Sequence, residues 1–187
     1  MKRVIEMVIN EADVNDGVFA ISVVNKPAIQ EDFIALSEHE IELKTIDAEK
    51  RILMGAVLVP KQEIPRIDKN GNVYYIKFSA QTIRKASELF LIRSNQNNAT
   101  LEHKVQLDDM SVVESWIVED SKVDKSALHG MKYDVGTWVV SMKVNNEDVW
   151  QEVKNGTIKG FSIEGRFSEG TQLAELDLLT QIKELLK

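Results

Sequence analysis

The chain has 187 residues, of which 43% are apolar, and this length and composition fit one globular domain with its own buried core. It contains no cysteine, which excludes disulfides, thiolate metal sites and a thiol nucleophile. The formal net charge of −7 has the wrong sign for binding nucleic acid through its phosphates. No apolar run is long enough to cross a bilayer, and the first residues carry charge where a signal peptide needs an apolar stretch, so we expect no signal peptide. From the charge and the apolar runs together, we expect neither nucleic acid nor a membrane as a partner.

The N-terminal residues predict two strands followed by an acidic arm. Apolar, β-branched runs over 4–9 and 18–24 are separated by a polar turn cluster. Residues 26–50 mix acids with isolated apolar residues at no clean period. We therefore expect residues 1–50 to form strands and an arm that pack on, or lead into, a larger domain at 51–170.

That domain begins with a continuous apolar run over 52–59, which predicts a strand buried on both faces. A loop with a turn follows, and 73–78 predicts the next strand. Ser79 is a suitable N-cap for a helix over about 80–92, in which apolar residues recur at spacings of three and four.

The rest of the chain predicts further strands, one short helix and an amphipathic tail. The short helix is expected over 147–154, and the tail over 171–187 predicts a helix that docks on the domain or joins a second copy in a homo-oligomer. The further strands are expected over 100–105, 112–119, 137–144 and 158–167. This order predicts an α+β fold, with a mostly antiparallel sheet closed or nearly closed into a barrel and a few helices outside.

One histidine and one glutamate can be placed opposite each other in this sheet. If Asp108-Asp109 forms a two-residue hairpin loop, His103 lies directly across from Glu114. Both residues interrupt apolar faces, where a histidine–carboxylate pair lowers the cost of burial. The pair has two interpretations: a structural pair in which each side chain satisfies the other, or a base and the acid that orients it.

A serine in a glycine-flanked strand is the second candidate for a catalytic residue. In Gly-Phe-Ser-Ile-Glu-Gly, Ser162 shares a strand face with Gly160 and Glu164. A serine in such a strand is common and carries no function by itself. A serine hydroxyl becomes a nucleophile when a base takes its proton, and His103 is the available base. No residue pattern calls for a cofactor or a metal ion.

These motifs together resemble the prohead maturation proteases of tailed bacteriophages, whose fold is similar to the herpesvirus assemblin barrel. The resemblance covers about residues 18–168. It rests on Leu-Glu-His-Lys at 101–104, Val-Glu-Ser-Trp-Ile-Val-Glu at 113–119, Gly-Thr-Trp-Val-Val at 136–140, Lys-Gly-Phe-Ser-Ile-Glu-Gly at 159–165 and the leader over 21–29.

The resemblance implies a serine endopeptidase that cuts scaffold and major capsid protein segments, and itself, inside the immature capsid in the host bacterial cytoplasm. Ser162 then matches the nucleophile and His103 the general base. Glu114 is the third member that the predicted hairpin favours, and Glu164 is its competitor because it shares a face with Ser162. Arg166 is a candidate for oxyanion support. The alternative function is an inactive barrel that binds capsid subunits as an assembly or scaffold-like protein.

Overall fold

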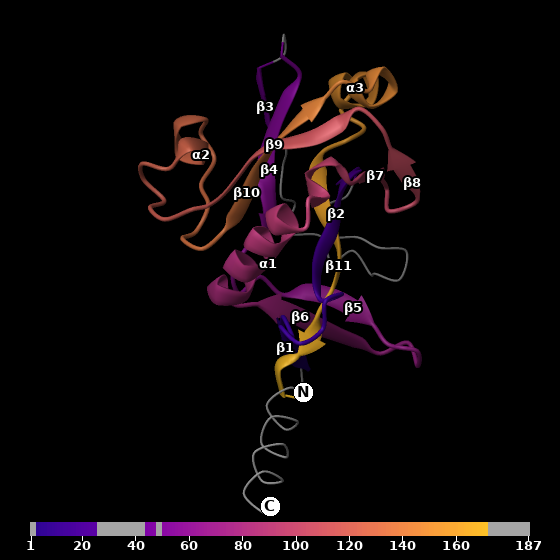
Figure 1. Cartoon of the computed structure of the whole chain (residues 1–187), viewed down its shortest axis with the longest axis vertical. Helices are drawn as coiled ribbons and strands as arrows, with labels where there is room; N and C mark the ends of the chain where they lie inside the picture. Colours follow the sequence, from indigo (N-terminus) through magenta and orange to yellow (C-terminus); the bar gives the residue numbers. More distant parts are fainter. Residues whose placement is uncertain (1–2, 26–43, 48–49, 172–187) are drawn as a thin grey trace, which may run out of the picture.

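The computed structural model describes residues 3–25, 44–47 and 50–171. Its strands form three four-stranded sheets. Figure 1 shows one sheet at each end of the molecule, with the long strands β2 (Gly17–Val24) and β11 (Gly160–Arg166) of the third running between them. The α+β class predicted from the sequence is confirmed. The closed barrel is wrong, because the described strands form three separate open sheets, two of which contain a parallel pair.

The first sheet lies at the end of the molecule that carries the N-terminal strand (Figure 1). Its strand order is β12 (Ser168–Glu169), β1 (Val4–Val8), β6 (Val73–Phe78) and β5 (Ile64–Ile67). The sequence predicts a loop where β5 forms, because this strand contains Pro65. At the edge of a sheet the missing N–H of proline costs no ladder hydrogen bond, so the strand is tolerated.

The second sheet lies at the opposite end and is antiparallel throughout. Its strand order is β3 (Lys44–Asp47), β4 (Ile52–Leu58), β10 (Trp138–Val144) and β9 (Met110–Ile117). All residues of β4 after Ile52 are buried, which confirms the prediction of a strand covered on both faces.

The third sheet, called the site sheet below, carries the candidate catalytic residues. Its strand order is β11, β2, β7 (Ala99–Leu101) and β8 (Val105–Leu107). The sequence predicts one strand over 100–105, whereas the structure has two short strands that a tight turn at 102–104 joins into a hairpin. His103 therefore lies in a turn and not within a strand.

The predicted hairpin around Asp108-Asp109 is wrong, because the strands on its two sides enter different sheets. β8 is the edge of the site sheet, and β9 pairs with β10 in the second sheet. The carbonyl of Asp109 accepts a hydrogen bond from the backbone N–H of Asn145 at 2.8 Å, directly after β10. This contact ties the start of β9 to β10, so the register expected across the two aspartates does not form.

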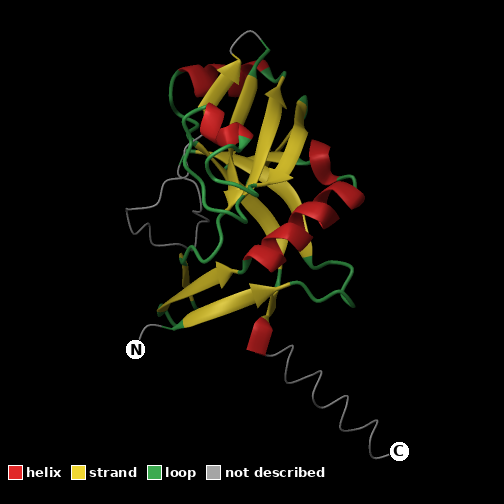
Figure 2. Ribbon diagram, turned by 90° about the vertical axis from the view of Figure 1, so that its left-hand side faces the viewer, coloured by secondary structure: helices red, strands yellow, loops and turns green. Residues whose placement is uncertain are grey.

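The helices expected over 80–92 and 147–154 both form, the first with its predicted cap. The Ser79 hydroxyl accepts the backbone N–H of Thr82 at 3.1 Å and begins α1 (Ala80–Ile92). Asn146 begins α3 (Glu147–Lys154) in the same way, through the N–H of Val149. Figure 2 shows α1 lying against the strands. Its Phe90 meets the fully buried Trp138 of β10 edge to face, with the ring centroids 5.5 Å apart.

The N-terminal strands are integrated with the strands that follow residue 50. β1 pairs with β6 and β12, while β2 lies between β11 and β7. Residues 26–43 of the predicted acidic arm and residues 172–187 of the predicted tail helix lie outside the described residues. A further short helix, α2, spans Lys125–Leu128. No helix in the described ranges is long and apolar enough to span a bilayer.

Candidate active site

The turn that carries His103 has an unusual backbone. Glu102 and His103 have φ angles of 51° and 58°, the left-handed region that side chains with a Cβ rarely adopt. The turn is closed by a hydrogen bond from the N–H of Lys104 to the carbonyl of Leu101, at 3.0 Å. Two successive left-handed residues cost of order 1–2 kcal/mol each, so surrounding contacts must hold this conformation.

The neighbouring strand β2 supplies these contacts. The backbone N–H of His103 donates to the Ser22 hydroxyl at 3.0 Å, and the N–H of Glu102 donates to the carbonyl of Val23 at 3.1 Å. The Glu102 carboxylate in turn accepts the N–H of Asn25 at 2.5 Å. The turn is therefore fastened by three hydrogen bonds to β2 and to Asn25, the residue that follows this strand.

The His103 imidazole faces a carboxylate of β11. Its Nδ1 atom lies 3.3 Å from Oε1 of Glu164, and the two side chains are only 11% and 19% exposed. The same oxygen accepts a hydrogen bond from the Thr100 hydroxyl. Because an ionised carboxylate can only accept, this contact favours the tautomer with the proton on Nδ1. Nε2 is then an acceptor, and it is buried with no hydrogen-bond partner among the described residues.

Ser162 lies on β11, the strand of the site sheet that also carries Glu164. It is directly opposite Ser22 on β2, which in turn is opposite Thr100 on β7, so three hydroxyl residues form a row across the strands. Side chains in such a row share one face, about 4.5–5.5 Å apart between Cβ atoms across an antiparallel pair. Ser162 and Glu164 also share this face, two positions apart on β11. Ser162 is 7% exposed, whereas Ser22 is fully buried.

The structure does not bring Glu114 to His103. Glu114 lies on β9 in the second sheet, where Lys125 Nζ is 2.6 Å from its Oε1. This hydrogen bond, with a smaller contribution from Ser141, lowers the pKa of Glu114 below its ordinary value. The predicted contact between residues 103 and 114 is wrong, because the hairpin on which it depended does not form. The competitor Glu164 occupies the position beside the imidazole.

Arg166 lies at the far end of β11, and its side chain contacts Asp13 and not His103 or Glu164. Nη2 of Arg166 is 3.5 Å from Oδ2 of Asp13 in the loop before β2, and the Arg166 side chain is 65% exposed. The register of β11 on β2 also shifts between Glu164 and Gly165, which interrupts the alternation of faces before residue 166 is reached.

Sequence reasoning missed Ser22 and Thr100. Each is a polar residue within an apolar strand, and this interruption is the feature of the sequence that could have indicated them. Their connection to His103 and Glu164 depends on a parallel pairing of β2 with β7, which no local pattern specifies. The residues that the structure describes contain no group of three or more histidine, aspartate or glutamate side chains suited to a metal ion.

Comparison with known proteins identifies the family to which the chain belongs. Residues 40–169 match a family described as "Putative phage serine protease XkdF", and because the match covers more than half of the chain, the chain belongs to that family. The kinship with phage serine proteases expected from the sequence is confirmed, while the assemblin-like fold is not.

Two curated proteins of Bacillus subtilis (strain 168) are similar to this chain. The uncharacterized protein YqbD is 27% identical over 160 residues, which cover 81% of this chain and 45% of YqbD. The phage-like element PBSX protein XkdF is 26% identical over 154 residues, which cover 78% of this chain and 50% of that protein. The chain thus spans about half the length of these relatives. No solved structure matches it.

Proposed function

We propose that the chain is a serine endopeptidase in which Ser162 is the nucleophile, His103 the general base and Glu164 the carboxylate that orients the imidazole. One observation carries this proposal. The Glu164 carboxylate, which shares a strand face with Ser162, lies at Nδ1 of His103, while Nε2 is buried without a hydrogen-bond partner among the described residues. A serine protease requires this division of the two ring nitrogens between an acid and a nucleophile.

The proposed reaction follows from these positions. The Ser162 hydroxyl attacks the carbonyl carbon of a peptide bond as its proton passes to Nε2 of His103. The imidazolium then donates that proton to the leaving amine, and an acyl-enzyme ester remains on Ser162. Water, deprotonated by Nε2, hydrolyses the ester and restores the serine. Glu164 stabilises the imidazolium in both steps. The 3.3 Å contact is long for a hydrogen bond, as is common before substrate binds.

The proposed substrates are segments of capsid and scaffold proteins and the chain itself, inside an immature capsid in the host bacterial cytoplasm. Two findings support this assignment: the family is described as a phage serine protease, and one relative is named a protein of a phage-like element. We also retain the proposals that the chain forms homo-oligomers and that Arg166 acts on the oxyanion, the latter through its backbone, since its side chain faces Asp13.

Labelling with a fluorophosphonate probe tests the proposed nucleophile. We expect the intact chain to be labelled at Ser162, and to cleave itself and the capsid protein when the two are co-expressed. Ser162→Ala should abolish both the labelling and the cleavage. Ser111→Ala is the matched control, because its hydroxyl bonds Asn97 at the surface and should not affect labelling. An unlabelled chain that still binds capsid subunits would instead indicate an assembly protein without turnover.

A further inference from the structure

We infer that Ser22 is a positioning residue that holds the His103 imidazole in its working place, an inference that rests on the proposed function. Ser22 does not react itself. It acts through the main chain of the turn at 102–103, and it also links that turn to the strand that positions Glu164.

The Ser22 hydroxyl is buried and fully hydrogen-bonded. The side chain is fully buried on β2, and its neighbours Ile21 and Val23 are fully buried as well. A hydroxyl at such a place is costly unless it is hydrogen-bonded. The Ser22 hydroxyl acts as both acceptor and donor. Its oxygen accepts the N–H of His103 at 3.0 Å, and its proton is donated to the carbonyl of Thr100 at 3.2 Å.

These two bonds control both partners of the proposed acid–base pair. The first fixes the backbone of His103 in a left-handed conformation, which an L-residue does not favour and which sets the direction of its Cβ. The second holds Thr100, whose own hydroxyl donates to the Glu164 oxygen that faces Nδ1 of His103. Loss of the Ser22 hydroxyl would therefore loosen the imidazole and its carboxylate together.

The same bonds separate the roles of the two facing serines. The Ser22 hydroxyl proton is directed to a backbone carbonyl and its oxygen is occupied by an amide, so it has no free geometry for attack on a substrate. Ser162, on the adjacent strand, is the more accessible member of the pair, at 7% exposed against a fully buried Ser22. We therefore assign the nucleophile to one serine and the support of the base to the other.

The test compares Ser22→Ala with the conservative Ser22→Thr, which keeps the hydroxyl. For Ser22→Ala we expect kcat on a cleavable peptide to fall at least tenfold while KM stays within twofold, because substrate contacts are unchanged and the base is misplaced. Ser22→Thr should recover most of kcat. Ser87→Ala is the matched control, since that hydroxyl also lies in a largely buried position and donates to a main-chain carbonyl, in α1.

A second measurement does not depend on turnover. Hydrogen exchange followed by NMR should show the His103 amide exchanging at least tenfold faster in Ser22→Ala than in the unmodified chain, with the α1 amides unchanged. An unchanged kcat, a change in KM alone, or an unchanged His103 amide would overturn the inference. If the unmodified chain neither cleaves peptides nor reacts with the probe, the proposed protease fails, and the catalytic role of Ser22 falls with it. The amide measurement would then show separately whether Ser22 holds the turn.

Discussion

The acidic partner of His103 is decided by which strand lies beside the turn that carries it. Glu164 is on β11 of the same sheet, 3.3 Å from the imidazole, and is held there by Thr100. Glu114 is in another sheet and is neutralised by Lys125. The sequence offered both carboxylates, and only the strand order separates them.

Substitution of the two glutamates should separate their roles. We expect Glu164→Gln to lower kcat about 10²-fold or more, because an amide neither stabilises the imidazolium nor fixes the tautomer as a carboxylate does. Glu114→Gln should leave kcat within roughly twofold, since Glu114 does not contact the site. Steady-state peptide cleavage measures both. A larger loss of kcat in Glu114→Gln than in Glu164→Gln would reverse the assignment.

Glu114 should instead affect stability at acidic pH. Hydrogen bonding to Lys125 lowers the pKa of its carboxyl, so its contribution is present above the pKa of the unfolded chain and is lost as pH falls through the folded value. Its side chain is 43% exposed, so the contribution should not exceed about 1 kcal/mol. Urea unfolding between about pH 6 and pH 3 should show Glu114→Gln losing less stability on acidification than the unmodified chain. If the free energy of unfolding fell by the same amount with pH in both proteins, this account would be contradicted.

At the scale of the elements, the sequence predicts an element correctly where that element depends only on contacts between residues close together in the chain. The cap and spacing of α1 depend on contacts within one turn of helix, and the predicted limits are those observed. The β7–β8 turn is different, because a Glu-His pair carries no local preference for two left-handed residues. That conformation is imposed by β2, which is distant in the sequence.

The cap of α1 makes a quantitative prediction. Replacing Ser79 with alanine removes the acceptor for the Thr82 N–H and should lower the free energy of unfolding by about 1 kcal/mol. Chemical denaturation measures this loss, with Ser111→Ala as a control whose surface hydrogen bond should contribute less. Equal effects of the two substitutions would show that the cap contributes nothing specific.

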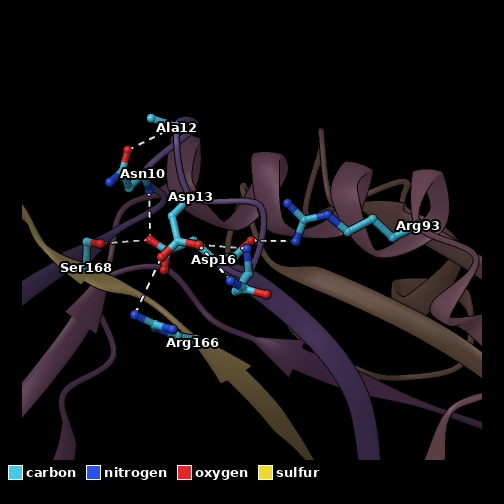
Figure 3. Close-up of polar contacts among 8 residues, drawn as sticks. Asn10, Ala12, Asp13, Asp16, Arg93, Arg166 and Ser168 are labelled. Carbon is cyan, nitrogen blue, oxygen red and sulfur yellow. Dashed lines mark hydrogen bonds and ion pairs between the residues drawn. The ribbon is translucent and has the colours of Figure 1, made fainter.

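At the scale of the whole molecule, a buried aspartate joins segments from three parts of the chain. Asp16 is 1% exposed, and its Oδ2 accepts the N–H of Asn10 at 2.9 Å and the hydroxyl of Ser168 at 2.8 Å. Its carbonyl accepts from Arg93, just after α1, at 2.6 Å (Figure 3). The loop before β2, the end of α1 and the start of β12 are thereby fixed to one another.

Removing this carboxylate should destabilise the entire fold. Asp16→Ala leaves the Asn10 amide and the Ser168 hydroxyl without their acceptor, and we expect a loss of about 2–3 kcal/mol. Asp13→Ala, in the same loop, should have a clearly smaller effect because Asp13 bonds neighbouring loop groups and the exposed Arg166. Urea denaturation followed by tryptophan fluorescence compares the two. A larger loss for Asp13→Ala would contradict this account.

The sequence by itself determined the α+β class, the two capped helices, the buried strand β4 and the residue types of a serine–histidine site. Each of these depends on periodicity, capping or composition within a short window. Only the tertiary structure decided that the strands form three open sheets, that Glu164 and not Glu114 meets His103, and that Ser22 supports the turn. These outcomes depend on contacts between residues far apart in the sequence, such as the 61 positions from His103 to Glu164 and the 81 positions from Ser22 to His103, and such contacts are set by how the whole core packs.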